Sequence, residues 1–317
     1  MARRCVGPVV LIVFVHVCNF IYYYYYTYNK LRISDGHAKH LTPTQVVNVG
    51  RQPNDGVWYN FSVPPALLFF AYTAFVDVRT SSAAAAVVRV IAISTKSEDQ
   101  RQHNVTLFCI FNYKDGRPAT VSRLVTDPSP IGYGYPLYGI QVKEYIYACP
   151  VMYNDLWPIS LSIFTEPQRQ NFTQSGAMPV EVPATQSVRK PLATCVQVAY
   201  ERLNPVRLVE WLEFQRLLGV SLVGVYLASD ISESAEKVFR HYADVDGLVD
   251  LRRSDYISRV AGGSTASPHQ YMLHWSPTIN DCIYRNMFRF SRIAVIDFDE
   301  VFAAYASVHP SLLGASP

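Results

Sequence analysis

The chain has 317 residues, of which half are hydrophobic and 17% are charged, a composition that indicates a folded protein and excludes a disordered one. A chain of this length predicts about two domains. The net charge of +3 is small and no basic run accompanies it, so nucleic acid is excluded as a partner.

Residues 1–30 predict a cytoplasmic tip followed by a transmembrane signal anchor. After Arg3 and Arg4 the chain is almost uncharged as far as Tyr28. At about 1.5 Å per residue, this stretch is long enough to cross a hydrocarbon core of about 30 Å. The tyrosines at 22–26 would form an aromatic belt at the membrane surface. A cleaved signal peptide is the alternative, although no small-x-small cleavage site follows the apolar run.

Sequons and cysteines favour placing the rest of the chain outside the cytosol. Glycosylation sequons begin at Asn60, Asn104 and Asn171. Four cysteines follow the anchor, an even number that suits an oxidising compartment. Cys109 and Cys149 are the favoured disulfide pair because each lies in a strand-like segment before the second domain, and their bridge would contribute about 3–4 kcal/mol. Four buried free thiols are the alternative.

Residues 31–56 are polar and irregular and predict a stem, whereas residues 57–190 predict a β-rich luminal domain. In the second range, segments rich in Val, Ile, Tyr and Phe alternate with turns that contain Gly and Pro. Short strands at such intervals indicate an antiparallel sheet or a sandwich. The expected strands cover residues 87–94, 105–112, 143–149 and 157–164.

Residues 191–317 predict a partial α/β domain, because strands and helices alternate there. Asn204 and Pro205 are typical of a helix start, and Gly219 is typical of a helix end. Repeated β-α-β units predict a mostly parallel sheet with flanking helices. The expected strands cover 193–199, 222–227, 247–251 and 293–296, and the expected helices cover 205–218, 232–242 and 277–290.

The clearest functional indication is the pair Asp297 and Asp299 at the end of the last strand. Residues 293–296 are β-branched or aliphatic, a pattern that predicts a strand buried on both faces. Alternation along that strand would place both carboxylates on one face. Such a pair suits a hard divalent cation, Mn²⁺ or Mg²⁺, that bridges to phosphate oxygens. This is the chemistry that a nucleotide-sugar transferase needs.

Other candidates follow from the rule that ligands of open parallel sheets bind outside the carboxyl ends of the strands. Tyr200 and Asp230 fall on that edge and are candidate nucleotide contacts. Asp281, in an expected first helical turn, lies at an ordinary position for a carboxylate. The carboxylates of the helix at 205–218 are expected to be solvated or structural.

The segments in order resemble glycosyltransferase family 92. The resemblance is carried by the strand from Cys195 to Tyr200, the helix around Trp211, the Asn280-Asp-Cys282 segment and residues 295–300. It implies a GT-A-like fold and a single-pass type II membrane protein of the Golgi or another secretory-pathway membrane, with most of the chain luminal. It also implies UDP-galactose as donor, manganese as metal, and galactosyl transfer to a glycan on a glycoprotein or glycolipid. Under this resemblance, Asp297 and Asp299 would hold the metal and the donor, and Asn280 and Asp281 would approach the donor.

The position of the carboxylate pair predicts an incomplete enzyme. Only residues 301–317 follow Glu300, whereas the second half of a GT-A domain normally supplies acceptor-binding elements. Ser276-Pro277 also interrupts the helix expected before Asn280. We therefore expect a domain truncated after the carboxylate pair, and the alternative function is that of a non-catalytic, membrane-anchored luminal or extracellular binding protein. A haloacid-dehalogenase-type phosphatase would also use Asp297 and Asp299, but the residues after this pair are too few to contain the later motifs of such an enzyme.

Overall fold

The computed structural model describes residues 58–61, 68–77, 79, 86–95, 105–124, 129–137, 140–152, 156–165, 177–184, 187–254 and 271–301. All of them belong to one unit, Gly50–Pro317. The predicted anchor and stem and the sequons at Asn104 and Asn171 lie outside the described residues. Among the residues that are described, no helix has the length and apolar character needed to span a membrane.

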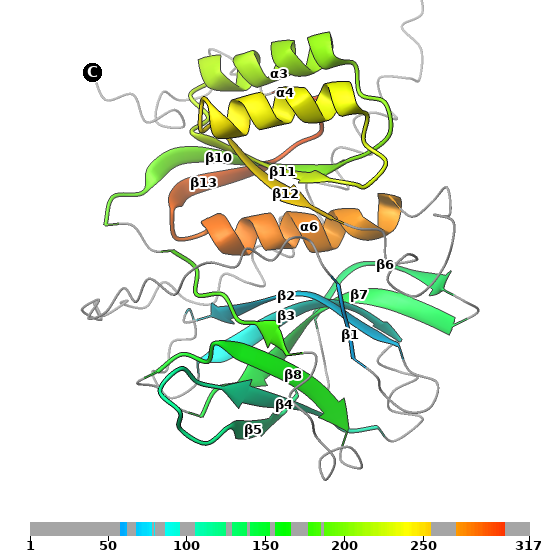
Figure 1. The fold of residues 1–317 in the computed structure, drawn as a ribbon, viewed down its shortest axis with the longest axis vertical. Coiled ribbons are helices and arrows are strands. Elements are labelled where there is room, and N and C mark those ends of the chain that lie inside the picture. The colour runs from blue at the N-terminus through cyan, green and yellow to red at the C-terminus, as the bar shows by residue number, and fades with distance from the viewer. Residues whose placement is uncertain are drawn as a thin grey trace, which may run out of the picture. The chain divides into compact units, whose positions relative to one another are not determined.

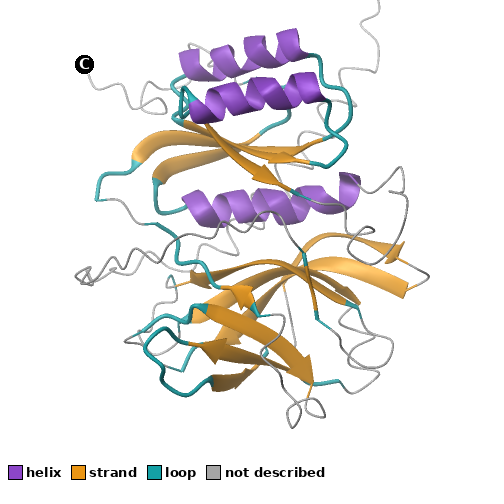
Figure 2. Ribbon diagram, in the orientation of Figure 1, coloured by secondary structure: helices purple, strands orange, loops and turns teal. Residues whose placement is uncertain are grey.

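Two antiparallel sheets form the sandwich that the sequence predicted (Figures 1 and 2). The inner sheet has the order β1-β2-β3-β7-β6, and the outer sheet has the order β5-β4-β8-β9. The strands at 87–94, 105–112, 143–149 and 157–164 are confirmed as β3, β4, β7 and β8, whereas β2 and β6 were not anticipated. The nine strands are β1 (Tyr59–Asn60), β2 (Phe69–Asp77), β3 (Val87–Thr95), β4 (Leu107–Asn112), β5 (Thr120–Arg123), β6 (Ser129–Leu137), β7 (Ile140–Pro150), β8 (Ser160–Thr165) and β9 (Met178–Pro179).

The two faces of the sandwich sheets meet in a hydrophobic core that a disulfide crosses. Phe69 of the inner sheet and Phe111 of the outer sheet belong to this core. Cys109 of β4 and Cys149 of β7 are fully buried in it and are bonded to each other, with Cα atoms 6.2 Å apart. The bridge therefore links the two sheets, and it joins the two cysteines that the sequence favoured.

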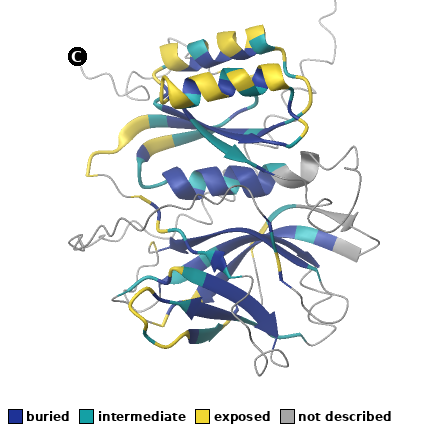
Figure 3. Cartoon of the chain, viewed as in Figure 1, coloured by how far each residue is buried: buried dark blue, intermediate teal, exposed yellow. Residues whose placement is uncertain are grey.

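The inner sheet is buried on its second face as well, where helix α6 (Tyr271–Asn286) packs against it. Phe75 of β2 stacks on Tyr284 of α6 with ring centroids 5.6 Å apart. Burial on both faces explains why every residue of β2 is buried and why its sequence is almost continuously apolar (Figure 3).

The third sheet is the predicted parallel one, with the order β12-β11-β10-β13. Helices α3 (Pro205–Leu217) and α4 (Glu233–Asp244) pack on one face, and α6 packs on the other (Figure 1). This arrangement confirms the α/β prediction and is compatible with a portion of a GT-A-like domain. The strands are β10 (Lys190–Ala199), β11 (Leu222–Leu227), β12 (Val249–Arg253) and β13 (Phe290–Val295).

Helix ends were predicted well for α3 and poorly for α6. The Asn204 side chain caps α3 by accepting from the amides of Val206 and Arg207 at 3.0 and 3.3 Å, and Gly219 has a φ of 80° after its end. The predicted interruption at Pro277 is wrong, because α6 begins at Tyr271 and continues through the proline. Pro277 lies in the second turn, and packing on both sides of the helix compensates for the hydrogen bond that proline cannot make.

The expectation that the last strand is buried on both faces is also wrong. β13 lies at the end of the strand order, so that β10 is its sole neighbour among the described strands. Ser291 and Arg292 are exposed, and Ile293–Val295 are only partly buried. The apolar residues of this strand reflect its position beside β10 and α6 rather than full enclosure.

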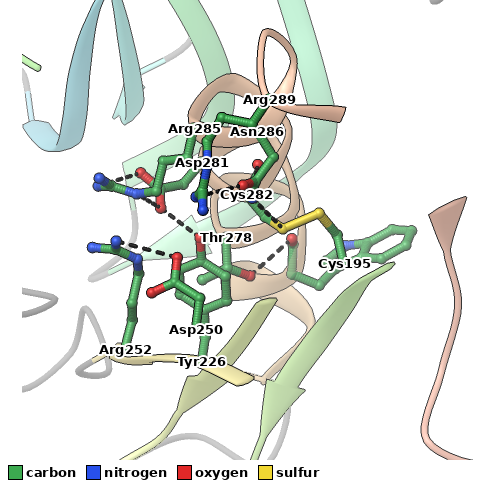
Figure 4. Close-up of a disulfide and its surroundings, with 11 residues drawn as sticks. Cys195, Tyr226, Asp250, Arg252, Thr278, Asp281, Cys282, Arg285, Asn286 and Arg289 are labelled. Atoms are coloured by element: carbon green, nitrogen blue, oxygen red, sulfur yellow. Dashed lines mark hydrogen bonds and ion pairs between the residues drawn. A yellow bond between two sulfur atoms is a disulfide. The ribbon is translucent and has the colours of Figure 1, made fainter. Parts of the chain in front are cut away.

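A second disulfide, between Cys195 of β10 and Cys282 of α6, ties the parallel sheet to this helix (Figure 4). Both residues are buried. Gly224 of β11 lies directly beneath the bridge, because a Cβ atom at this position would approach the Cys282 Sγ to 2.5 Å. The glycine therefore makes room for the disulfide in the middle of a strand.

Glu144 of β7 is a buried carboxylate beside α6. Its side chain is 1% exposed, and neither oxygen has a hydrogen-bond partner among the described residues. It lies over Gly132, where a Cβ atom would come within 1.2 Å of Glu144 Oε2 and 3.0 Å of Ser276 Oγ. Burial raises the pKa of Glu144 well above its usual value, and Ser276 and Lys143 oppose this only in part. Burial therefore favours the neutral form of this carboxyl group in the folded protein.

Replacing Glu144 with glutamine should stabilise the protein more at pH 8 than at pH 5. In the unfolded chain the carboxyl group ionises near its ordinary pKa, whereas burial raises its pKa in the folded protein, so the wild type loses stability as pH rises above the unfolded value. Glutamine cannot ionise, and we expect a gain of about 1–2 kcal/mol at pH 8. Urea unfolding of the two proteins at both pH values measures this, with Glu210→Gln on the exposed surface as the control. An equal effect at both pH values would contradict the assignment.

Candidate active site

The two candidate metal ligands lie in a turn that follows β13. The strand ends at Val295, and the Glu300 amide donates to the Asp297 carbonyl oxygen at 3.1 Å. The Glu300 carboxylate in return accepts from the Asp297 amide, also at 3.1 Å. The prediction that Asp297 and Asp299 share one strand face is therefore wrong. The chain has left the sheet before it reaches them, and the turn sets their positions.

Phe298, between the two aspartates, anchors this turn in the core of the α3/α4 face. Its ring centroid lies 5.4 Å from that of Trp211 in α3 and 5.5 Å from that of Phe239 in α4. With Phe298 directed into the protein, Asp299 is exposed and Asp297 is partly buried. The turn thus presents its carboxylates to solvent while its middle is fixed.

The turn lies at the carboxyl edge of the sheet, where the connections change direction. From β10 the chain proceeds through α3 and α4 to β11 and β12 on one side, whereas β13 lies on the other side of β10 and is reached through α6. Ligands of open α/β sheets bind at such switch points. Because the strands are parallel, Tyr200 after β10 and Asp230 after β11 fall on the same edge as Asp297. Tyr200 is half-buried, and Asp230 is exposed.

Backbone strain at this edge was not foreseen from the sequence. Glu201, which follows Tyr200, has a φ of 54°, and among the described residues other than glycine it alone has a positive φ. Its carbonyl oxygen accepts from the Ser232 amide at 2.9 Å, which holds the strained residue between β10 and α4. Strained residues of this kind gather at functional sites. No feature of a lone glutamate in the sequence indicates this conformation.

The charges of the turn repel one another. Partial burial, followed by the negative charges of Glu300 and Asp299, raises the pKa of Asp297 from 3.8 to about 6. Carboxylates that disfavour each other's ionisation are stabilised by a cation, because the cation removes the repulsion. The electrostatics therefore fit a divalent ion at Asp297 and Asp299.

The described residues contain no group of three or more His, Cys, Asp or Glu side chains arranged to hold a metal ion. Two carboxylates still fit Mn²⁺ or Mg²⁺, because a Mg²⁺-type site commonly takes one or two protein carboxylates and completes its coordination with water and substrate phosphates. Asp299 in this turn is exposed, which suits an ion that takes further ligands from solvent.

Asn280 is placed away from this turn. It lies within α6, and its side-chain amide donates to the Ser276 carbonyl oxygen at 2.8 Å. α6 covers one face of the parallel sheet, whereas the turn packs against α3 and α4 on the other face. A contact between Asn280 and the donor therefore stays a prediction.

Asp281 has a structural environment, and the expected position in a first helical turn is wrong because α6 begins ten residues earlier, at Tyr271. Its carboxylate is fully buried, accepts from the Tyr226 hydroxyl at 2.5 Å and pairs with Arg285 at 2.7 Å (Figure 4). Arg285 also binds Glu181, whose backbone bridges to β2 of the inner sheet. Asp281 thus helps to join the parallel sheet, α6 and the sandwich.

The carboxylates of α3 are structural or solvated, as the sequence predicted. Glu213 accepts from the Tyr242 hydroxyl of α4 at 2.6 Å, and Glu210 is exposed.

The first sequon residue, Asn60, lies on β1 and is exposed, which leaves it accessible to a glycan.

Comparison with known proteins relates the α/β part of the chain to a family. Residues 190–311 match the family model described as Glycosyltransferase family 92, and the resemblance found in the sequence is confirmed. No curated protein matches the chain. A solved structure of ferredoxin-NADP+ reductase from Plasmodium falciparum with 2'P-AMP aligns at 9% identity over 69% of this chain and 79% of its own, but its TM-score of 0.17 carries no argument about the fold.

Proposed function

Residues 190–311 match the model of glycosyltransferase family 92, and from this premise we propose that the chain transfers a galactosyl group from UDP-galactose to a glycan on a glycoprotein or glycolipid. In this reaction the bond between the anomeric carbon and the diphosphate oxygen breaks, the acceptor hydroxyl oxygen forms a new bond to that carbon and releases its proton, and UDP leaves. The observation that supports the proposal best is the carboxylate turn at the switch point of the parallel sheet.

The residues at the carboxyl edge of the sheet would have separate roles in metal binding and nucleotide binding. Asp297 and Asp299 would hold Mn²⁺ or Mg²⁺, and the ion would neutralise negative charge on the departing diphosphate. Tyr200 and Asp230 would contact the nucleotide, since they follow β10 and β11 on the same edge. The strained Glu201 fixes the direction in which the chain leaves β10 next to Tyr200.

The proposal includes a secretory-pathway location. We propose a single-pass type II protein of the Golgi or another secretory membrane, anchored by residues 1–30, with the described residues in the lumen. Two disulfides, Cys109–Cys149 and Cys195–Cys282, support an oxidising compartment. The exposed Asn60 sequon supports the same assignment.

Replacing Asp299 with asparagine should strongly weaken the metal-dependent binding of UDP-galactose. The substitution keeps the size of the side chain and removes the charge, so we expect affinity to fall by about a hundredfold, since a hydrogen-bonded charge pair contributes about 2–3 kcal/mol. Calorimetric titration of the full chain with UDP-galactose, with and without Mn²⁺, measures the effect. Glu210→Gln, an equally conservative change on the exposed face of α3, is the matched control.

Binding that ignores both the metal and the Asp299 substitution would exclude the donor site. Metal-dependent binding without transfer to any acceptor glycan would instead favour the alternative function, a membrane-anchored binding protein.

Mn²⁺ binding should weaken as pH falls through about 6. The pKa of Asp297 is raised to about 6, and protonation removes the negative charge that the cation needs. Affinity should therefore decline by up to tenfold per pH unit below that value and stay constant between pH 7 and 8. Titration of the full chain with Mn²⁺ from pH 5 to pH 8 measures the profile, and an unchanged affinity at pH 5 would exclude Asp297 as a ligand.

A further inference from the structure

We propose that Trp211 is a positioning residue that sets the geometry of the Asp297 and Asp299 pair. Trp211 lies in α3, far from these aspartates in the sequence, and is 5% exposed. Its importance for the metal and the donor rests on the proposed function. Its effect on the geometry of the turn is independent of that function.

Trp211 contacts the turn at two separate points. Its indole N–H donates to the Glu300 carbonyl oxygen at 2.8 Å, and its ring meets the Phe298 ring edge-on with centroids 5.4 Å apart. Phe298 lies between the two aspartates, and Glu300 follows the second one. One buried side chain therefore holds both the residue that separates the carboxylates and the residue that ends the turn.

The turn needs an anchor from outside because its own interactions are weak. It begins at the edge strand β13, and the bond from the Asp297 amide to the Glu300 carboxylate is exposed, so water competes for it. Repulsion among Asp297, Asp299 and Glu300 opposes closure of the turn. The indole bond is part-buried and comes from a buried side chain, and it joins the turn to a helix that is packed on the sheet. A fixed separation of two carboxylates is what a small cation requires.

Packing alone does not account for the indole bond. Trp211 also belongs to the hydrophobic core between α3, α4 and the parallel sheet, and a phenylalanine would fill most of that space. Only the N–H group requires tryptophan. Trp211→Phe therefore removes the bond to Glu300 while retaining an aromatic ring against Phe298.

Hydrogen–deuterium exchange of the full chain tests the positioning role without metal. In Trp211→Phe, we expect the backbone amides of Asp297 and Glu300 to exchange about tenfold faster, which corresponds to the loss of one neutral hydrogen bond. Amides of β10 and β11 should be unchanged. The matched control is Tyr242→Phe. It removes a hydroxyl group of α4 that donates a hydrogen bond at 2.6 Å to Glu213 of α3, the helix that also carries Trp211. It should leave exchange in the turn unchanged.

Calorimetric titration with Mn²⁺ then links the turn to the metal. We expect Trp211→Phe to bind Mn²⁺ about tenfold more weakly than the wild type, and Tyr242→Phe to bind it equally well. Unchanged exchange in the turn of Trp211→Phe overturns the inference whatever the metal does, and so does faster exchange with an unchanged Mn²⁺ affinity. A wild type that binds no Mn²⁺ contradicts the proposed function, while the exchange result still decides whether Trp211 positions the turn.

Discussion

Replacing Arg285 with methionine should lower the free energy of unfolding by about 3–5 kcal/mol, because it leaves a buried charge without its partner. The Arg285 side chain is 8% exposed and donates to both oxygens of Asp281, at 2.7 and 3.0 Å, and to Glu181 at 2.6 Å. Burial alone would lower the pKa of Arg285, but Asp281 and Glu181 raise it well above its usual value, so the guanidinium stays charged. Urea unfolding of the full chain measures the loss.

The comparison that isolates the buried pair uses two further variants. Arg240→Met removes an exposed ion pair with Glu236 from α4 and should change stability by no more than about 0.5 kcal/mol. Adding Asp281→Asn to Arg285→Met should recover part of the loss, because the uncompensated carboxylate is then neutral. A loss below about 1 kcal/mol for Arg285→Met would show that α6 and the sandwich do not depend on this network.

Replacing Cys195 and Cys282 together with alanine should lower the free energy of unfolding by about 4–5 kcal/mol. The two cysteines are 87 residues apart, and the bridge restricts the unfolded chain over that whole loop. The buried sulfur atoms also fill space above Gly224, which the alanines would leave partly empty. Denaturant unfolding of the variant beside the oxidised wild type measures the difference.

The matched comparison is the pair Cys109→Ala and Cys149→Ala, whose separation of 40 residues predicts a loss of about 4 kcal/mol. The two double variants should also differ in where they loosen the protein. Loss of the Cys195–Cys282 bridge should speed amide exchange in α6 and β10, whereas loss of the other bridge should affect β4 and β7. A Cys195 and Cys282 variant as stable as the wild type would exclude a contribution from this disulfide.

Secondary-structure elements that depend on interactions between residues close in the sequence were predicted closely. The Asn204 cap, Pro205 and Gly219 define α3 through interactions within a few residues, and the structure places that helix where the sequence does. The alternation of apolar segments and helix signals likewise predicted the parallel sheet with its flanking helices. Each of these features depends on neighbours along the chain, which a single sequence displays.

Elements whose boundaries depend on packing were predicted poorly. Pro277 lowers the intrinsic preference for helix, but α6 is enclosed by the parallel sheet on one side and the inner sheet on the other, and burial outweighs the lost hydrogen bond. Ile293–Val295 have the composition of an enclosed strand, yet β13 is an edge strand in the described structure. The composition of a segment indicates its preference for a buried strand, but it does not indicate how many strands and helices surround that segment in the fold.

By itself, the sequence determined which residues are candidates for chemistry in this protein. Asp297 and Asp299 follow an apolar strand, and parallel strands bring their carboxyl ends to one edge whatever the details of packing. Tertiary structure decided how the two carboxylates are held: they lie in a turn closed by Glu300, with Phe298 packed against Trp211. The contact that fixes the turn joins residues 89 positions apart in the chain, and no local pattern encodes a contact of that range.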